Sequence, residues 1–592
     1  MQSKTSFFNV AIFKKNTTRF WPIWVCYQLI WLISAVVPLM INLKSGNEYF
    51  TVRDSLIGMG NVGILFGMFF GIMAAAALWS YLFNARSASF MASLPVRREG
   101  MFLTNYLTGL IWFVGVNIVT TLMLMGVMAA NGVLDMAAAM DFFGAVTLSG
   151  IFCYSFATLL AMMTGNMIML PIFYFILNFA WVIIRTFAME GVISSLIYGV
   201  VANEEVLPEL SPLVKMLGTR VYVEGLPYLV REWTWFGIYA AIGLVFAVIA
   251  LVVYKKRNME SAGDVVSFKA LRPVFKYFTT FSGAIVFGVI LFMMFGYGAG
   301  SSAIIPLIIC MVIGCFFSYY LAEMLIHKSF RVMKSGARGF LVASVIIVVA
   351  LFVIDMDVFG IERKIPEASE VERVAIRGMG AQETVIREAE NIELTIMEHY
   401  DFVENKKLYD RSDRGYRTVW LQYYLKDGSL LERRYNVIYN EPLMDKKIER
   451  LENVWNSREG IASRICPPFP VTSESISGFN VSFYDPENGY YTGKSFGYLQ
   501  AVEFYNDYLL RDCENGTIGK VGIDGYYRAG DYSVQIQMDI VDPNTRQFLW
   551  ISLYVSPEAE NVVKWLEDNG IPLAYPPREE IYGEYPAAAR YW

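Results

Sequence analysis

The chain has 592 residues, of which 55% are hydrophobic and only 17% are charged. Soluble domains carry about 25% charged residues, so this composition excludes a wholly soluble enzyme. The charge is unevenly distributed, because residues 1–360 hold 23 Lys and Arg against 16 Asp and Glu, whereas residues 361–592 hold 26 against 38. A basic, apolar first region and an acidic, polar second region indicate a membrane domain followed by a domain in water.

Apolar stretches long enough to cross about 30 Å of hydrocarbon recur through the first region. We expect α-helical spans near residues 21–43, 57–83, 102–130, 142–164, 167–188, 234–254, 277–298, 302–326 and 339–355. Residues 1–20 carry Lys14, Lys15 and Arg19 and are expected to form an interfacial helix. Residues 189–233 are half apolar but too broken to span, which favours short helices at the outer membrane face.

The basic residues also predict an orientation. With the N-terminus in the cytoplasm, 17 of the 23 Lys and Arg of the first region fall on that side. An odd number of spans then leaves residues 361–592 outside the cell. We therefore expect a six-span core at 21–254, three additional spans at 255–360 and an extracytoplasmic α+β domain at 361–592.

The second region alternates apolar and polar residues on both sides of two turns. Asp427-Gly428 predicts one β-hairpin and Asp542-Pro543-Asn544 a second. Helical spacing follows in residues 441–457, 496–515 and 557–570, and we find no fixed-period repeat. The cysteines of this region, Cys466 and Cys513, could form a disulfide if the domain faces an oxidising compartment.

Catalytic and cofactor-binding signals are weak. The two histidines of the chain, His327 and His399, leave little for metal sites or for Ser-His-Asp chemistry. The segment 488–495 departs from the phosphate-binding loop pattern, since Asn488 stands where the first glycine is required, so we interpret it as an ordinary loop. We expect a chain that is no enzyme, holds no cofactor or metal, and has no nucleic-acid partner.

The loop NARSASFMASLPVRREGMFLTNYLTGL, residues 84–110, is the most informative segment. Small and polar residues precede Ser93-Leu94-Pro95, and a basic pair, Arg97 and Arg98, follows. Pro95 would end a short helix, and the basic pair would lie at the headgroups. From composition alone, a basic membrane-flanking loop is the simpler interpretation.

This loop, the N-terminal interfacial segment and the outer loop at 189–233 together resemble the permease subunits of ABC-2-type transporters. Residues 3–24 and 254–277 are similar to a Gram-positive branch of that family, which adds further spans and a large C-terminal extracytoplasmic domain. The resemblance covers residues 1–360 well and the C-terminal domain only in position and size.

The resemblance implies a plasma-membrane export pathway without its own motor, for a hydrophobic, peptide or lipid-like compound. Separate cytosolic ATPase subunits would bind ATP and Mg, and a second permease, identical or related, would complete the assembly. The positions carried over as ATPase-docking candidates on the loop are Arg86, Ser89, Phe90, Leu94, Arg97 and Arg98. The alternative is a membrane receptor or sensor whose outer domain binds a ligand.

Three further features admit two interpretations each. Gly63, Gly67 and Gly71 line one helical face, which favours close packing within the chain over a permease–permease seam along the pathway. Glu323 lies one turn from His327, which favours a local ion pair over a gating or proton-relay role. Arg185, near the outer end of the fifth span, is expected to anchor at the headgroups rather than to serve transport.

Overall fold

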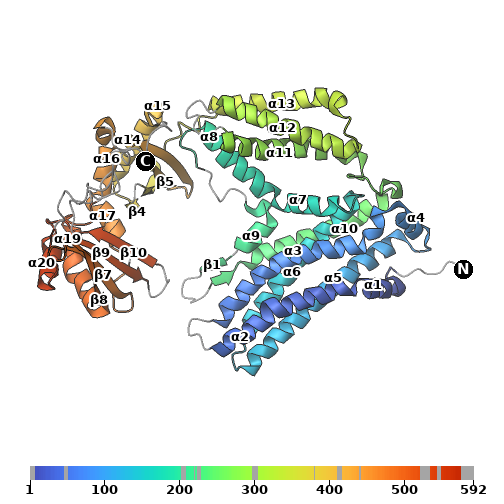
Figure 1. Cartoon of the computed structure of the whole chain (residues 1–592), viewed down its shortest axis with the longest axis horizontal. Helices are drawn as coiled ribbons and strands as arrows, with labels where there is room; N and C mark the ends of the chain where they lie inside the picture. The colour runs from blue at the N-terminus through green and yellow to red at the C-terminus, as the bar shows by residue number, and fades with distance from the viewer. Residues whose placement is uncertain are drawn as a thin grey trace. The chain divides into compact units, whose positions relative to one another are not determined.

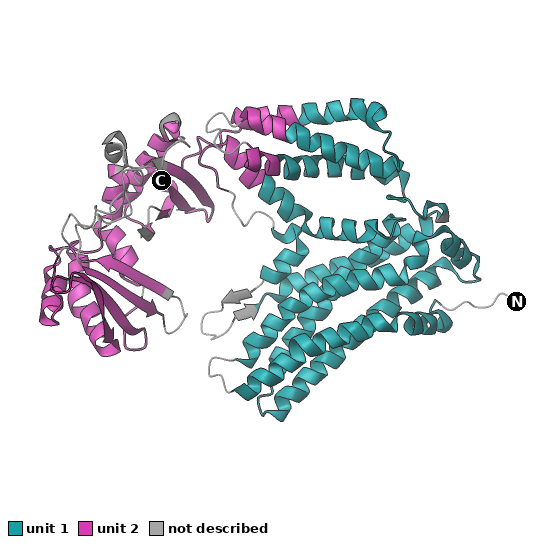
Figure 2. Cartoon of the chain, viewed as in Figure 1, with its two compact units in different colours: residues 1–187, 204–288, 311–346 teal, residues 188–203, 289–310, 347–592 magenta. Residues whose placement is uncertain are grey.

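The computed structural model describes most of the chain. The described residues are 7–45, 51–201, 208–218, 220–222, 229–295, 304–378, 381–409, 416–438, 442–467, 469–520, 534–542 and 548–574. They belong to two compact units, shown in Figure 2, which comprise residues 1–187, 204–288 and 311–346 in the first and 188–203, 289–310 and 347–592 in the second.

Nine helices within the described ranges are long and apolar enough to cross a membrane, as expected for a multi-pass membrane protein. They are Val10–Ser45 (α1, η1 and α2), Val52–Leu78 (α3), Arg98–Ala130 (α5), Met136–Met163 (α6), Met169–Leu196 (α7, η3 and α8), Trp233–Lys256 (α10), Lys269–Phe295 (η6 and α11), Ile304–His327 (α12) and Met333–Asp355 (α13) (Figure 1). Each predicted span overlaps one of these helices.

The first helix differs from the expected arrangement of an interfacial helix followed by a span. Asn9 caps its start by accepting hydrogen bonds from the backbone of Ala11 and Ile12 at 3.0 and 3.2 Å. From Val10 the helix continues to Ser45 without a break. Lys14, Lys15 and Arg19 therefore lie in the first turns of the same helix that continues into the first candidate span.

In the first unit, α6 packs against α3, α5 and α10, and α1 packs against α5 (Figure 1). Small residues make the approach close. A side chain on Gly243 of α10 would come within 2.8 Å of the Phe152 Cα of α6. Because lipid tails are as apolar as the helices, such van der Waals contact is the main source of helix association here.

Short elements connect the spans. They are η2 (Ser80–Phe83), α4 (Ala85–Ser93), η4 (Pro208–Leu210), α9 (Pro212–Gly218), β1 (Arg220–Tyr222), β2 (Leu229–Arg231) and η5 (Met259–Ser261). In the expected outer loop at 189–233, the structure adds an antiparallel ribbon, β1 with β2, to the predicted short helices.

Beyond residue 360 the chain forms two four-stranded antiparallel sheets. The first has the order β4-β3-β5-β6, with β3 at Val371–Gly378, β4 at Ala381–Ile386, β5 at Tyr416–Leu425 and β6 at Leu430–Ile438. The second has the order β8-β7-β9-β10, with β7 at Ile476–Asp485, β8 at Tyr490–Gly497, β9 at Val534–Val541 and β10 at Phe548–Tyr554. The two predicted hairpins are β5–β6 and β9–β10.

The helices of the two sheets also correspond. In the first half, α14 (Ala389–Glu404) joins the hairpins and α16 (Pro442–Trp455) follows them. In the second half, the continuous helix of α18 (Tyr498–Glu503), η9 (Phe504–Leu509) and α19 (Leu510–Glu514) joins the hairpins, and α20 (Glu560–Asp568) follows. The region is thus a repeat of hairpin, helix, hairpin and helix, although its sequence shows no fixed period. Two short helices, α15 (Lys406–Tyr409) and α17 (Arg458–Ile465), lie outside this pattern.

Candidate functional site

The loop between α3 and α5 contains the helix predicted from the sequence. Asn84 caps α4 by accepting a hydrogen bond from the backbone of Arg86 at 3.0 Å. The helix ends at Ser93, and the extended backbone of Leu94 (ψ 142°) precedes Pro95, as expected for a residue before proline. α4 therefore has nine residues and is separated by a tight turn from α5, which begins at Arg98.

A buried arginine connects the start of this loop to the spanning helices through hydrogen bonds. Arg257 follows the last turn of α10 and is 2% exposed. Its guanidinium donates to the carbonyls of Ala161 and Met162, at 2.7 and 3.1 Å, and to the carbonyl of Leu82 at 3.1 Å. Carbonyls in the last turn of a helix have no partner within the helix, so one arginine here satisfies the end of α6 and of η2 together.

The other side of the loop is fastened to α10. Arg98 Nη1 donates to the carbonyls of Lys255 and Arg257 at 3.0 and 3.3 Å. Lys255 also forms an ion pair with Glu99 in the first turn of α5. We call these contacts, with those of Arg257, the α4 brace. In the sequence, Arg257 is the last of three consecutive cations, and local patterns do not predict its burial.

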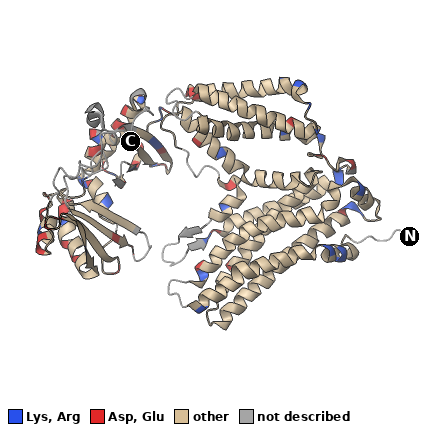
Figure 3. Ribbon diagram, viewed as in Figure 1, with Lys and Arg blue, Asp and Glu red and all other residues tan. Residues whose placement is uncertain are grey.

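The six docking candidates differ in their surroundings. Arg86, Phe90 and Leu94 line a cavity of about 470 Å³. Ser89 and Arg97 are exposed and do not line it, and Arg98 belongs to the α4 brace. Lys and Arg gather at this end of the helices (Figure 3).

The glycine stripe of α3 faces α6. A side chain on Gly67 would contact the Gly150 Cα at 3.4 Å, and one on Gly71 would contact the Tyr154 backbone nitrogen at 3.1 Å. At Gly63 it would meet the Trp31 ring at 2.7 Å. The three glycines thus pack against residues of the same chain.

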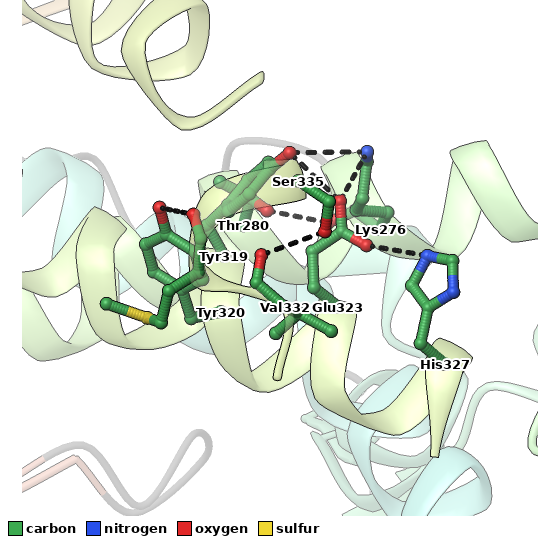
Figure 4. A network of polar contacts seen from close by, with 9 residues as sticks. Lys276, Thr280, Tyr319, Tyr320, Glu323, His327, Val332 and Ser335 are labelled. Carbon is green, nitrogen blue, oxygen red and sulfur yellow. Dashed lines mark hydrogen bonds and ion pairs between the residues drawn. The ribbon is translucent and has the colours of Figure 1, made fainter. Parts of the chain in front are cut away.

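Glu323 lies at the centre of a polar network between α11 and α12 (Figure 4). Although only 6% exposed, its carboxylate accepts hydrogen bonds from Lys276 Nζ and the Tyr319 hydroxyl, both at 3.0 Å. His327 Nε2 lies 3.2 Å from the second carboxylate oxygen. The predicted contact with His327 is present. The structure adds an ion pair with Lys276, which the sequence did not indicate.

Two further arginines, Arg185 of α7 and Arg231 of β2, have buried guanidinium groups. Arg185 is in the last turn of α7, and its Nε and Nη2 atoms are buried without a hydrogen-bond partner among the described residues. Arg231 is 3% exposed and forms an ion pair with Asp141 at 3.1 Å and a hydrogen bond with Asn61 at 2.9 Å. These partners of Arg231 are 90 and 170 residues away in the sequence, so local patterns do not predict the contacts.

The segment that approximates a phosphate-binding loop has a different structure. Residues 490–495 belong to the edge strand β8 rather than to a loop before a helix. Lys494 Nζ donates to the carbonyl of Asn569 at 2.8 Å. In the part of the chain that the structure describes, no group of three or more His, Cys, Asp or Glu residues is arranged to hold a metal ion.

No protein-family model, no curated protein and no solved structure matches the chain. Its function must therefore be argued from the membrane helices and from the fixed loop that carries α4.

Proposed function

We propose that this chain is the membrane subunit of an ABC-2-type transporter and that it exports a hydrophobic, peptide or lipid-like compound. In this proposal α4 and the N-terminus are cytoplasmic, the β-sheet region is outside the plasma membrane, and a second permease subunit completes the pathway. ATP and Mg bind to separate cytosolic ATPase subunits.

The observation that carries the proposal is the α4 brace. A loop that only connected two spans would need no buried arginine at its base. Here the loop is attached to the ends of α6 and α10 through Arg257 and Arg98, and α6 in turn packs against α3. A partner that moves α4 as a rigid body would therefore move several spanning helices with it.

The exposed surface of α4 has the properties of a docking element. The helix is short and its Ala88 is buried at 1% exposure, so it is seated on the membrane domain on one side. Ser89 and Arg97 remain exposed beside it. Short helices that seat in a groove of a partner are a common mode of recognition.

The test is to tag the full-length chain, extract it gently from its native host and identify what co-purifies. We expect a stoichiometric ATPase subunit and ATP hydrolysis in the preparation. A Ser89→Arg, Arg97→Glu double variant should lose that subunit, whereas Lys14→Glu on α1 should retain it. None of the three changed residues belongs to the α4 brace, so both variants should fold.

Two other results would contradict parts of this proposal, and the first would favour the receptor alternative. If the wild-type chain purifies without an ATPase and without ATP hydrolysis, the transporter proposal fails. If the ATPase co-purifies equally with both variants, the subunit docks elsewhere and α4 is only a connector.

A further inference from the structure

The cavity beside α4 is bounded by the first turns of α1, by η2, by α4 and by the first turns of α5. Three cations from two of these elements line it, namely Lys15, Arg19 and Arg86. No acidic residue is among the lining residues. Among the described residues, no ion pair involves any of the three cations, so their charge is available to a ligand.

The cavity also contains a buried hydrogen-bond donor. Asn105 of α5 is 2% exposed and lines the cavity. Its carbonyl oxygen accepts a hydrogen bond from Asn16 Nδ2 at 2.7 Å, whereas its own Nδ2 has no hydrogen-bond partner in the described part of the chain. The Tyr81 hydroxyl interacts with the Asn105 side chain, and it forms a hydrogen bond with Tyr254 at 2.9 Å. Because a buried donor without an acceptor is costly, this site favours a ligand with an acceptor oxygen.

Apolar side chains also line the cavity, and α1 continues beyond it with exposed apolar residues. Phe20, Phe90 and Leu94 line the cavity with the cations. Over the two turns after Phe20, α1 exposes Trp21, Val25 and Leu29, which are 56%, 42% and 50% exposed. Free phosphate would gain nothing from this apolar lining, whereas the headgroup of a lipid seated beside α1 would contact both cations and apolar groups.

We propose that this cavity binds the phosphodiester headgroup of an anionic phospholipid. The cations neutralise the phosphate, and Asn105 Nδ2 donates to one of its oxygens. Phe20, Phe90 and Leu94 contact the glycerol and the start of the acyl chains. The site fastens α4 to the membrane surface, and it needs only this chain, so it does not depend on the proposed ATPase docking.

The test uses the purified full-length chain in a neutral detergent. Dioctanoylphosphatidylglycerol is titrated, and bound lipid is counted by native mass spectrometry. A Lys15→Gln, Arg86→Gln variant should bind about tenfold more weakly, because each cation near a phosphate contributes substantially to binding. The matched control, Lys14→Gln with Arg97→Gln, removes the same charge outside the cavity and should change the affinity less than twofold.

A second variant separates the cavity from general electrostatic attraction. Asn105→Leu keeps the net charge and should weaken binding about fivefold through the lost hydrogen bond. Equal losses in the two double variants would overturn the proposal, because the attraction would then be diffuse.

Two added ligands identify the occupant. If inorganic phosphate competes as well as the lipid does, a lipid site is excluded. If a purified ATPase subunit displaces the lipid, the occupant is a protein segment and the assignment is likewise overturned. Because the titration itself contains no ATPase, its failure would leave the docking proposal intact.

Discussion

The two halves of the β-sheet region share one topology but stabilise it with different cores. In the first half the core includes polar groups: His399 is fully buried and its Nε2 lies 2.7 Å from the Tyr435 hydroxyl. In the second half Trp565 of α20 packs on Phe496 and Phe504 at ring-centroid distances of 4.8 and 4.7 Å, within a mostly aliphatic core. That half of the sequence contains no histidine. The same order of strands and helices thus does not require the same core chemistry.

The outward faces of the two sheets differ as well. On the first sheet, Arg373 stacks on Tyr424 at 4.1 Å and Arg377 pairs with Glu383 at 3.0 Å. On the second sheet, uncharged groups meet across the strands, as where Ser495 donates to Asn480 at 2.7 Å. The halves thus share a backbone arrangement, whereas the polar contacts on their sheets differ.

The largest expected effect would show whether the halves unfold separately. Trp455 and Trp565 lie near the ends of the corresponding helices α16 and α20 and are 1% and 5% exposed. Trp565→Ala should destabilise the second half by about 3–5 kcal/mol through the cavity it leaves. Hydrogen exchange on the full-length chain should then quicken in β7 and β9 but not in β3 and β5.

Trp455→Ala is the reciprocal control and should quicken exchange in the first half. If either variant affects both halves equally, the region is one cooperative unit and the comparison of two separate cores fails.

A disulfide would sharpen the difference between the halves, because only the second contains cysteines. The sulfur atoms of Cys466 and Cys513 lie 3.5 Å apart as free thiols. The hydrogen bond between them lowers the pKa of Cys466, which favours the reactive thiolate. Mild oxidation should yield a peptide linked through these residues and stabilise the second half by about 2–4 kcal/mol.

The matched control for oxidation is Cys513→Ser, which should show no linked peptide and no change in hydrogen exchange. Failure of the wild-type chain to form the bond under an oxidant that modifies both thiols would contradict the close pairing.

Arg464 connects the halves, and its loss should affect both. It is 4% exposed, and its guanidinium donates to Thr384 Oγ1 of β4 at 3.0 Å and to the carbonyl of Gly519 at 2.9 Å. Arg464→Met should cost about 2–3 kcal/mol, since hydrogen bonds from a charged group are the stronger kind. Arg458 lies exposed on the same helix, so Arg458→Met is the matched control and should have little effect on stability. If Arg464→Met destabilises only one half, the residue does not link the two halves.

Local patterns allowed the spans and the β5–β6 and β9–β10 hairpins to be predicted, because hydropathy and turn residues act over short stretches of sequence. The α4 brace could not be predicted in this way. Arg257 bonds carbonyls 96 and 175 residues away, and a basic residue after a span looks the same whether it faces water or a buried helix end. The repeat of the β-sheet region could not be predicted for a related reason, since its two halves share the order of strands and helices rather than a sequence pattern.

The smallest expected effect is a pH dependence of stability that only the first half should show. Burial, and next the charge of Arg433, lowers the pKa of His399 to about 3, whereas in the unfolded chain it is about 6.5. Between these values the unfolded state binds the proton more readily, so stability is complete above pH 6.5 and falls as the pH decreases toward 3. At pH 5 the first half should have lost about 2 kcal/mol relative to pH 7.5.

Hydrogen exchange corrected for intrinsic rates should show this loss in β3 and β5, and His399→Gln should remove the dependence. The second half contains no histidine, so an equal loss in β7 and β9 would assign the pH effect to other groups and contradict its origin in the core around His399.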